Sequence, residues 1–276
     1  MTTTTQGSKR LFKLLCVLGL STIASTAMAA QTWDFGSCGN TAANQTGSGT
    51  FGNSWSCGGV TVYGFGGGSG AAAGTYQTAN VEPHGTSNGF GVNSQYEGIN
   101  PSSPNHTMDN NPTGNAPELL LLKFNTAVAL GTVTVGWSTN DSDMTIMAYK
   151  GALDLKTAIV GKNVSTLMGL AGWGLVQNVG DAAPDTAYGD STTDRAYSFN
   201  SGNVVSSWWL ISAYSSSFGA GTLDSLSDYV KVLSVASKDV SIPQGGQLPE
   251  PGTLAMAGVA LLGLLGTRRH VRKSTP

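Results

Sequence analysis

The second half of the chain alternates apolar and polar residues with the two-residue period of β-strands. In residues 132–137, Val133, Val135 and Trp137 fall on one face, which we expect to be the core face, and the threonines on the other. Residues 144–149 form a second β-rich run after a short polar turn. The pattern therefore predicts two antiparallel strands that pair with each other as a hairpin.

Further runs complete the predicted sheet. Residues 119–124 are continuously apolar, which is typical of a buried strand, and residues 207–214 are apolar on both faces, which indicates a central strand. Residues 228–235 fit a last strand, and residues 59–65 alternate as an earlier one. Short strands with Gly and Asn turns predict an all-β fold, an antiparallel β-sandwich or jelly-roll-like body. Residues 153–170 have mixed periodicity that fits a short helix.

Glycine changes this picture in the first half of the body. Sixteen of the 56 residues from Gly36 to Gly91 are glycine, and they follow no Gly-x-y period, which excludes collagen. Prolines interrupt residues 82–117, which we expect to be mainly loop. We therefore divide the body into residues 30–117, rich in Gly, Ser and Asn and expected to be poorly packed or extended, and residues 118–240, expected to form the β-sandwich core. Both parts are compatible with one sandwich.

The N-terminus has the pattern of a secretory signal peptide. Basic residues precede the apolar run 14–23, and Ala27 and Ala29 form a small-x-small cleavage site. We expect signal peptidase to cleave after Ala29 and to remove the signal helix of residues 1–29. Cys16 lies inside the apolar run and follows Leu15. A lipoprotein would need a small residue immediately before the cysteine, so we do not expect lipidation.

The C-terminus combines three features in order. Pro249, Glu250 and Pro251 form an extended segment, because each proline fixes φ and disfavours helix in the residue before it. The uncharged residues 253–266 would be about 21 Å long as a helix, which is short for a hydrocarbon core of roughly 30 Å. The basic residues that follow would stay on the cytoplasmic side of a membrane. Residues 241–248 form a flexible linker in front of this tail, which spans 249–273.

This tail resembles the PEP-CTERM sorting signal of bacterial surface proteins. The resemblance implies recognition by an exosortase, a membrane transpeptidase-like enzyme of Gram-negative bacteria that make extracellular polysaccharide. It also implies that Pro249, Glu250 and Pro251 are the recognition and processing site, and that segment 253–266 holds the protein in the membrane as a short transmembrane helix until it is cut. The chain departs from the pattern in the three residues that follow its basic end, 274–276. A plain C-terminal anchor and a buried core helix are the alternatives.

The body is similar to small exosortase-dependent surface proteins, in which a Trp, an Asp-Ser-Asp turn and a late Trp-Leu-Ile-x-Ala-Tyr run recur. Here these are Trp137, residues 141–143 and residues 209–214. The tail module has also been labelled as an ice-binding protein C-terminal domain. Ice binding needs flat arrays of Thr-x-Thr, and residues 132–134 stand alone, so we do not expect that activity.

Removal of both signals changes the charge of the protein. The chain has 14 basic and 16 acidic residues, but residues 30–248 keep 7 basic and 15 acidic residues, a net charge of −8. This balance disfavours nucleic acid and anionic membrane surfaces as partners, because both bind basic faces. It is compatible with divalent cations, although a solvated acidic surface is the commoner meaning.

Two cysteines remain in the exported part. A single pair in an oxidising compartment predicts a disulfide between Cys38 and Cys57. Closing a loop of about 20 residues should stabilise the fold by about 3 kcal/mol. Two free thiols are the alternative, and neither cysteine has a second Cys or a His at the spacing of a metal site.

Two pairs of residues are candidates for ligand binding. Asp141 and Asp143 follow Asn140 in a turn and offer oxygen ligands to Ca²⁺, but Asp and Asn also dominate ordinary turns. Trp208 and Trp209 point to opposite faces of their strand, so one of them could stack on a sugar ring, with core packing as the alternative. The acidic loops 109–111 and 181–194 fit ordinary turns better still. We expect no cofactor, and calcium is the one candidate that the sequence offers.

Catalytic motifs are missing from the sequence. The exported part has two histidines, His84 and His106, and contains neither G-x-S-x-G nor a Walker A motif. We therefore expect a non-enzymatic protein of the cell surface or of the extracellular (biofilm) matrix, inserted in the membrane through its C-terminal segment before processing. Extracellular polysaccharide is a candidate partner. The alternative is a carbohydrate- or calcium-binding adhesive module, and a third hypothesis is a glycan hydrolase that uses two of the 15 acids.

Overall fold

The structure is a computed structural model that describes residues 26–39, 41–47, 51–98, 101–110, 116–180, 195–219, 223 and 226–242. Residues 27–240 form one compact unit. Strands β1 (Thr26–Met28) and β16 (Val240–Ile242) pair as a two-stranded sheet. The compact unit contains the body of the protein, and its fold determines where the candidate sites lie.

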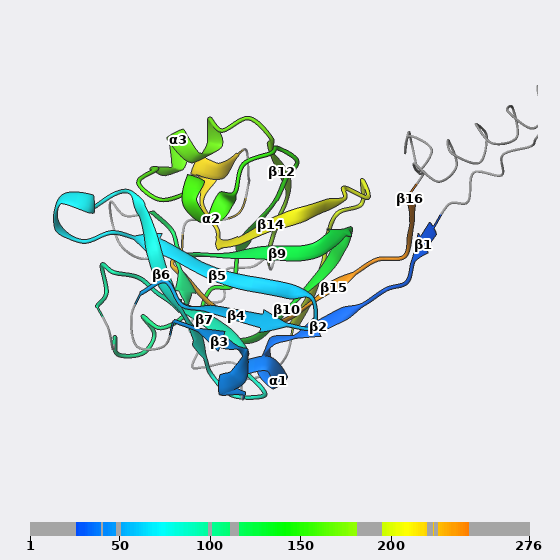
Figure 1. The fold of residues 1–276 in the computed structure, drawn as a ribbon. Coiled ribbons are helices and arrows are strands. Elements are labelled where there is room, and N and C mark those ends of the chain that lie inside the picture. The colour runs from blue at the N-terminus through cyan, green and yellow to red at the C-terminus, as the bar shows by residue number, and fades with distance from the viewer. Residues whose placement is uncertain are drawn as a thin grey trace, which may run out of the picture. The chain divides into compact units, whose positions relative to one another are not determined.

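One antiparallel sheet forms most of this body (Figure 1). Its strands are hydrogen-bonded in the order β12, β11, β14, β9, β5, β6, β7, β15, β10 and β13, with β4 on β5, β3 on β4, and β2 and β8 on β15. The first half of β6 pairs with β5 and the second half with β7, so β6 connects two layers of the sheet. The bounds of the strands are β2 (Thr32–Asp34), β3 (Gln45–Thr46), β4 (Ser54–Cys57), β5 (Val60–Gly67), β6 (Tyr76–Pro83), β7 (Phe90–Asn93), β8 (Met108–Asp109), β9 (Leu119–Val128), β10 (Leu130–Asn140), β11 (Met144–Tyr149), β12 (Trp173–Val179), β13 (Arg195–Ser198), β14 (Ser206–Ala213) and β15 (Asp228–Ser237).

The main core lies between the two layers. Alternate residues of β9 and β14 point into it, including Leu120, Leu122 and Trp209, and Val230 and Val232 of β15 contribute from the other layer. The predicted all-β fold is therefore confirmed, as an antiparallel sheet that curves until it nearly closes on itself.

A second apolar cluster covers the outer face of β9, β11 and β14. It includes Leu121, Met147 and Leu210, and it is closed by the short helices α2 (Leu155–Ala158) and α3 (Val164–Met168). Asp154 and Asn163 cap these helices by accepting hydrogen bonds from the amides of Lys156 and Thr166. Figure 1 shows both helices on the side of the body that carries β12 and β14. The remaining helices are α1 (Phe35–Gly39) and the single turns η1 (Ala42–Asn44), η2 (Gly70–Ala72) and η3 (Ser216–Phe218).

The predicted hairpin is wrong. Strands β10 and β11 form at the expected places, but β10 pairs with β13 and β15, whereas β11 pairs with β12 and β14. The turn between them carries the chain from one layer to the other, and Asn140 takes a left-handed conformation there, with φ of 63°. The apolar faces of both strands are buried by this arrangement.

The alternation along β10 is also interrupted. Val135 pairs with Val232 but Trp137 pairs with Lys231, so two residues of β10 advance against one of β15. This β-bulge reverses the facing of Trp137 relative to Val133 and Val135, which join the main core. Trp137 is buried as expected, but on the face of the sheet that carries Lys231.

The expectation of a poorly packed N-terminal part is wrong. Phe35, Trp55, Val62 and Phe90 all belong to the main core, and β5 is a central strand between β6 and β9. The disulfide between Cys38 and Cys57 is present and joins α1 to the end of β4. The glycines therefore allow close packing in this region rather than preventing it.

Within the part of the chain that the structure describes, no helix is long and apolar enough to cross a membrane. The expected signal helix and the apolar segment 253–266 lie outside the described residues.

Candidate functional site

The processing sites predicted at the two ends of the body are described only in part. Pro249, Glu250 and Pro251 lie outside the described residues, whereas Ala27 lies in β1 and Ala29 is exposed just after it. Cleavage after Ala29 would leave Ala30 as the first residue, and its amide nitrogen lies 2.5 Å from Asp239 Oδ1. The amide of Gln31 donates to Ser237 Oγ at 2.9 Å. The expected mature N-terminus is thus attached to the end of β15.

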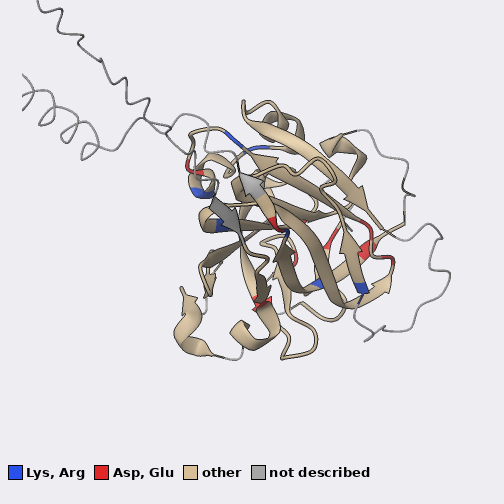
Figure 2. Cartoon of the chain, turned by 90° about the vertical axis from the view of Figure 1, so that its right-hand side faces the viewer, with Lys and Arg blue, Asp and Glu red and all other residues tan. Residues whose placement is uncertain are grey.

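Charged residues are sparse on the ribbon of the body (Figure 2), so groups of acidic residues are conspicuous. Asp141 and Asp143 are brought together with Asp228, the first residue of β15, and one carboxylate oxygen of each lies within 4.8 Å of the others. Asp228 accepts hydrogen bonds from the amide of Asp143 at 2.8 Å and from the side chain of Asn110. A Cβ on Gly180 would collide with Asp143 Oδ1, so β12 also ends against this group.

This first acidic cluster contains the two aspartates that the sequence predicts as calcium ligands. Asp228 was not predicted, because it lies 85 residues from Asp143 and only sheet formation brings the two together. The hydrogen bonds of Asp141 Oδ1 with the amide of Ser142, and of Asp228 with Asp143, fit the ordinary turn chemistry that was the alternative. Calcium at Asp141 and Asp143 stays a prediction.

A second acidic cluster was not predicted. Glu97 follows β7, Asp109 ends β8 and Glu118 immediately precedes β9, and one carboxylate oxygen of each lies within 4.8 Å of the others. Asp109 and Glu118 are buried. No local pattern marks this group beyond an Asp-Asn-Asn sequence at 109–111, because Glu97 and Asp109 come from the region that we interpreted as loop and Glu118 is the first residue of the expected sandwich core.

Burial controls the electrostatics of this second cluster. Desolvation, with smaller contributions from Asp109 and Glu97, raises the pKa of Glu118 well above its usual value. Desolvation also raises the pKa of Glu97. Both carboxyl groups therefore resist ionisation unless a positive charge lies beside them.

The two histidines lie side by side with a buried lysine. The His84 and His106 rings are 4.5 Å apart, and Lys231 Nζ donates to His106 Nε2 at 3.2 Å while it lies 4.2 Å from the centre of the Trp137 ring. Burial, followed by the charge of Lys231 and by His106, lowers the pKa of His84 to about 4. His84 is therefore neutral at pH 7, and its Nε2–H donates to the carbonyl oxygen of His106 at 3.0 Å.

The tryptophans predicted as a sugar platform are packed in the two apolar clusters. Trp209 is 0 % exposed, and its Nε1–H donates to the carbonyl oxygen of Ser206. Trp208 is 8 % exposed and has Lys123 Nζ at 5.0 Å from its ring centre. Their opposite facing is confirmed, but neither indole presents an open face to a sugar, because layers pack on both sides of β14. Core packing, the alternative, describes both residues.

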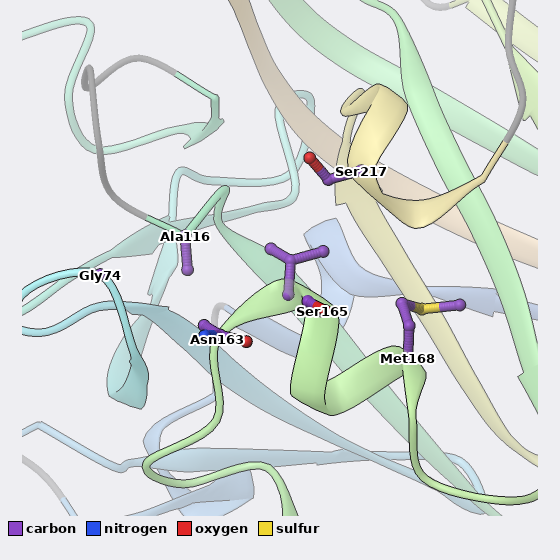
Figure 3. Close-up of a pocket in the computed structure, with 7 residues that line it drawn as sticks. Gly74, Ala116, Asn163, Ser165, Met168 and Ser217 are labelled. Atoms are coloured by element: carbon purple, nitrogen blue, oxygen red, sulfur yellow. The ribbon is translucent and has the colours of Figure 1, made fainter.

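A pocket of about 500 Å³ lies between helix α3 and the single turn η3 (Figure 3). Asn163, Ser165 and Met168 line it from α3 and its cap, and Ser217 lines it from η3. None of the lining residues is titratable. The pocket therefore offers hydrogen bonds and apolar contact, without a general acid or base among its lining residues.

The comparison with known families bears on the tail. Residues 247–270 match the PEP-CTERM protein-sorting motif. No curated protein matches the chain. The motif confirms the resemblance stated from the sequence, and it is the signal by which an exosortase recognises exported proteins for sorting to the cell surface.

Proposed function

We propose that this protein is a non-enzymatic scaffold of the bacterial cell surface or extracellular matrix, exported by its signal peptide and processed by an exosortase at Pro249-Glu250-Pro251. The observation that carries the proposal is the sorting motif at residues 247–270. It follows a separate compact unit, residues 27–240, which is the part that sorting would deliver. Processing at the Pro-Glu-Pro sequence would leave this unit intact.

The composition of the delivered part supports a passive role. Residues 30–248 contain 22 charged residues and carry a net charge of −8. This negative charge favours solubility and disfavours binding to anionic surfaces. The disulfide and the interlayer core supply stability outside the cell.

A calcium-binding adhesive module is the second candidate. The observation that favours it is the convergence of Asp141, Asp143 and Asp228, because hard oxygen ligands from separate strands are what Ca²⁺ binds. The carbohydrate version has less support, because Trp208 and Trp209 are buried. A glycan hydrolase would be supported by hydrolysis of the producing cell's own polysaccharide by purified protein, and absence of release would count against it.

The sorting proposal predicts two cleavages. Intact-mass analysis of protein extracted from the cell surface should show loss of residues 1–29 and of residues beyond about Pro249–Pro251. Replacing Pro249, Glu250 and Pro251 together by alanine should leave the tail attached and the protein in the membrane fraction. Pro243→Ala, in the linker, is the matched control and should be processed normally.

Deleting the exosortase of the producing strain should reproduce the effect of the triple substitution. Normal processing of the triple variant, or of the wild-type chain in the deletion strain, would refute exosortase sorting. A full-length chain with both ends intact in the cytosol would refute export as well.

A further inference from the structure

The second acidic cluster has a geometry that the surface-scaffold role does not explain. Glu97, Asp109 and Glu118 come from three separate segments, yet their carboxylate oxygens lie within 4.8 Å of one another. Glu118 is 2 % exposed. Like charges this close repel, and taking them out of water adds a desolvation cost. Some compensating charge or proton is therefore required.

In each of the two glutamates, Oε2 accepts hydrogen bonds from the protein and Oε1 does not. Glu118 Oε2 accepts a hydrogen bond from the amide of Asp109 at 3.3 Å, and Glu97 Oε2 accepts from the amide and hydroxyl of Ser94 at 3.3 and 3.2 Å. Glu118 Oε1 and Glu97 Oε1 are buried and accept no hydrogen bond from a donor among the described residues. The two carboxyl groups are close enough to hydrogen-bond to each other when one of them carries a proton, and a cation would take the place of that proton. One oxygen of each carboxylate is thus held by the protein, and the other remains available as a ligand.

The three carboxylates lie together, and no positive charge acts on Glu118 among the described residues. The charges that act on Glu118 in the described part of the chain are those of Asp109 and Glu97, and no basic side chain is among them. Gly66 of β5 faces the group, and a Cβ there would lie 3.3 Å from Glu118 Oε1 and 2.7 Å from Ser94 Cβ. The absence of a side chain at Gly66 lets Ser94 and Glu118 approach each other.

We propose that Glu97, Asp109 and Glu118 bind a calcium ion, with the buried Oε1 of Glu118 as a central ligand. The ligand atoms are all oxygen, which suits a hard cation and disfavours zinc or copper, which take nitrogen and sulfur. Calcium accepts irregular sets of six to eight oxygens, and water would complete the shell. This proposal goes beyond the sorting function and does not depend on it.

The ion would fasten the segment between β7 and β9 to the sheet. Glu97 and Asp109 lie within that segment, and Glu118 is fixed at the start of β9, where its carbonyl oxygen accepts from Ser212 Oγ at 2.8 Å. Calcium would thus bridge a proline-rich connection to a rigid strand. Binding to the folded state alone raises the melting temperature, so the site makes stability dependent on calcium.

The test compares calcium binding and unfolding in the full-length protein, produced with its own signal peptide and purified in mild detergent. After treatment with EDTA and its removal, calcium chloride is titrated by calorimetry and the melting temperature is recorded with and without the ion. Glu118→Gln keeps the shape of the side chain and removes the charge. Glu82→Gln in β6 is the matched control, because Glu82 lies outside both clusters.

We expect the wild-type protein and Glu82→Gln to bind calcium and to melt at a higher temperature in its presence. Glu118→Gln should bind one ion fewer per chain, or bind it at least tenfold more weakly, and its melting temperature should rise much less. Without calcium, Glu118→Gln should melt at or above the melting temperature of the wild type, because the variant lacks a buried carboxylate.

Several results would overturn the proposal. If the wild-type protein binds no calcium, the carboxyl groups share protons instead. If Glu118→Gln binds as many ions as tightly as the wild type, calcium is held elsewhere, for example at Asp141, Asp143 and Asp228. Tighter binding of magnesium than of calcium would show that the ion is misassigned. Glu97→Gln, at a more exposed position, repeats the test in case Glu118→Gln does not fold, and it should also weaken binding at least tenfold.

Discussion

His84, His106 and Lys231 gather three basic side chains in a buried part of the structure. The group is tolerated because His84 and His106 are neutral: burial and the charge of Lys231 lower both pKa values. Lys231 Nζ lies over the ring of Trp137 and donates a hydrogen bond to the imidazole of His106. The bulge in β10, which turns Trp137 toward Lys231, is what makes this arrangement possible.

The lowered pKa of His84 predicts a loss of stability in acid. The pKa is about 4 in the folded protein and about 6.5 in the unfolded chain, so the unfolded chain binds the proton first. Stability from this group is complete above pH 6.5 and is lost as the pH falls toward 4. Because part of the ring is near solvent, we expect a loss on the order of 1–2 kcal/mol.

Urea unfolding at pH 7 and pH 4.5, compared between wild type and His84→Gln, measures this effect. The substituted glutamine can still donate to the carbonyl oxygen of His106 but does not titrate, so the stability of the variant should depend less on pH. The carboxyl groups of both acidic clusters are the same in the two proteins, so their contributions cancel in the comparison. An equal pH dependence in the two proteins would refute the assignment.

Among the secondary-structure elements, loops pack on strands through positions that have no side chain. A Cβ on Gly136 in β10 would collide with the carbonyl oxygen of Ser87 and lie 3.0 Å from that of Asn88. Gly89 lies against β15 in the same way, with φ of 80°. The loop between β6 and β7 therefore covers the bulged part of β10, where Trp137 and Lys231 are buried.

This packing predicts a difference between two glycines in strands. Gly136→Ala should lower the free energy of unfolding by about 1–3 kcal/mol, because the new methyl group meets backbone that cannot rotate away. Gly174→Ala in β12 is the matched control: a Cβ there has no neighbour within 4 Å. It should be neutral or slightly stabilising. Equal changes in the free energy of unfolding for the two variants, measured with denaturant, would show that the loop between β6 and β7 moves to accommodate the methyl group.

In the body as a whole, the N-terminal and C-terminal halves share one core. The disulfide joins α1, whose Phe35 stacks on Phe90, to β4, which pairs with the central strand β5. The glycine-rich region thus has fixed contacts on several sides. Its unfolded state is restricted as well, because the bridge closes a loop between residues 19 positions apart.

Replacing Cys38 and Cys57 together by serine should lower the free energy of unfolding by about 3 kcal/mol, chiefly through the larger entropy of the unfolded chain. Denaturant unfolding of oxidised wild type and of the double variant measures the difference. Dithiothreitol should destabilise the wild type toward the variant and leave the variant unchanged. If the reductant affects both proteins equally, the bridge is not the cause.

The local features of this protein could be predicted from the order of its residues. The apolar runs at 119–124, 207–214 and 228–235 each lie in a strand of the structure. They could be recognised because a two-residue period, or a continuous apolar run, is visible in consecutive residues. The sorting motif at 247–270 is equally local. The pairing of Cys38 with Cys57 could be predicted because they are the two cysteines outside the expected signal peptide, and the structure contains this disulfide.

Which distant residues meet could be known only from the folded body. Strand partners depend on the burial of whole faces, so β10 joined β15 instead of the adjacent β11, and one bulge reversed the facing of Trp137. Asp228 reached Asp143, and Glu118 reached Glu97, through sheet pairing across long stretches of chain. Alternation along a strand records which face is apolar but not which strand will cover it, and for that reason both acidic clusters took their full form only in the folded molecule.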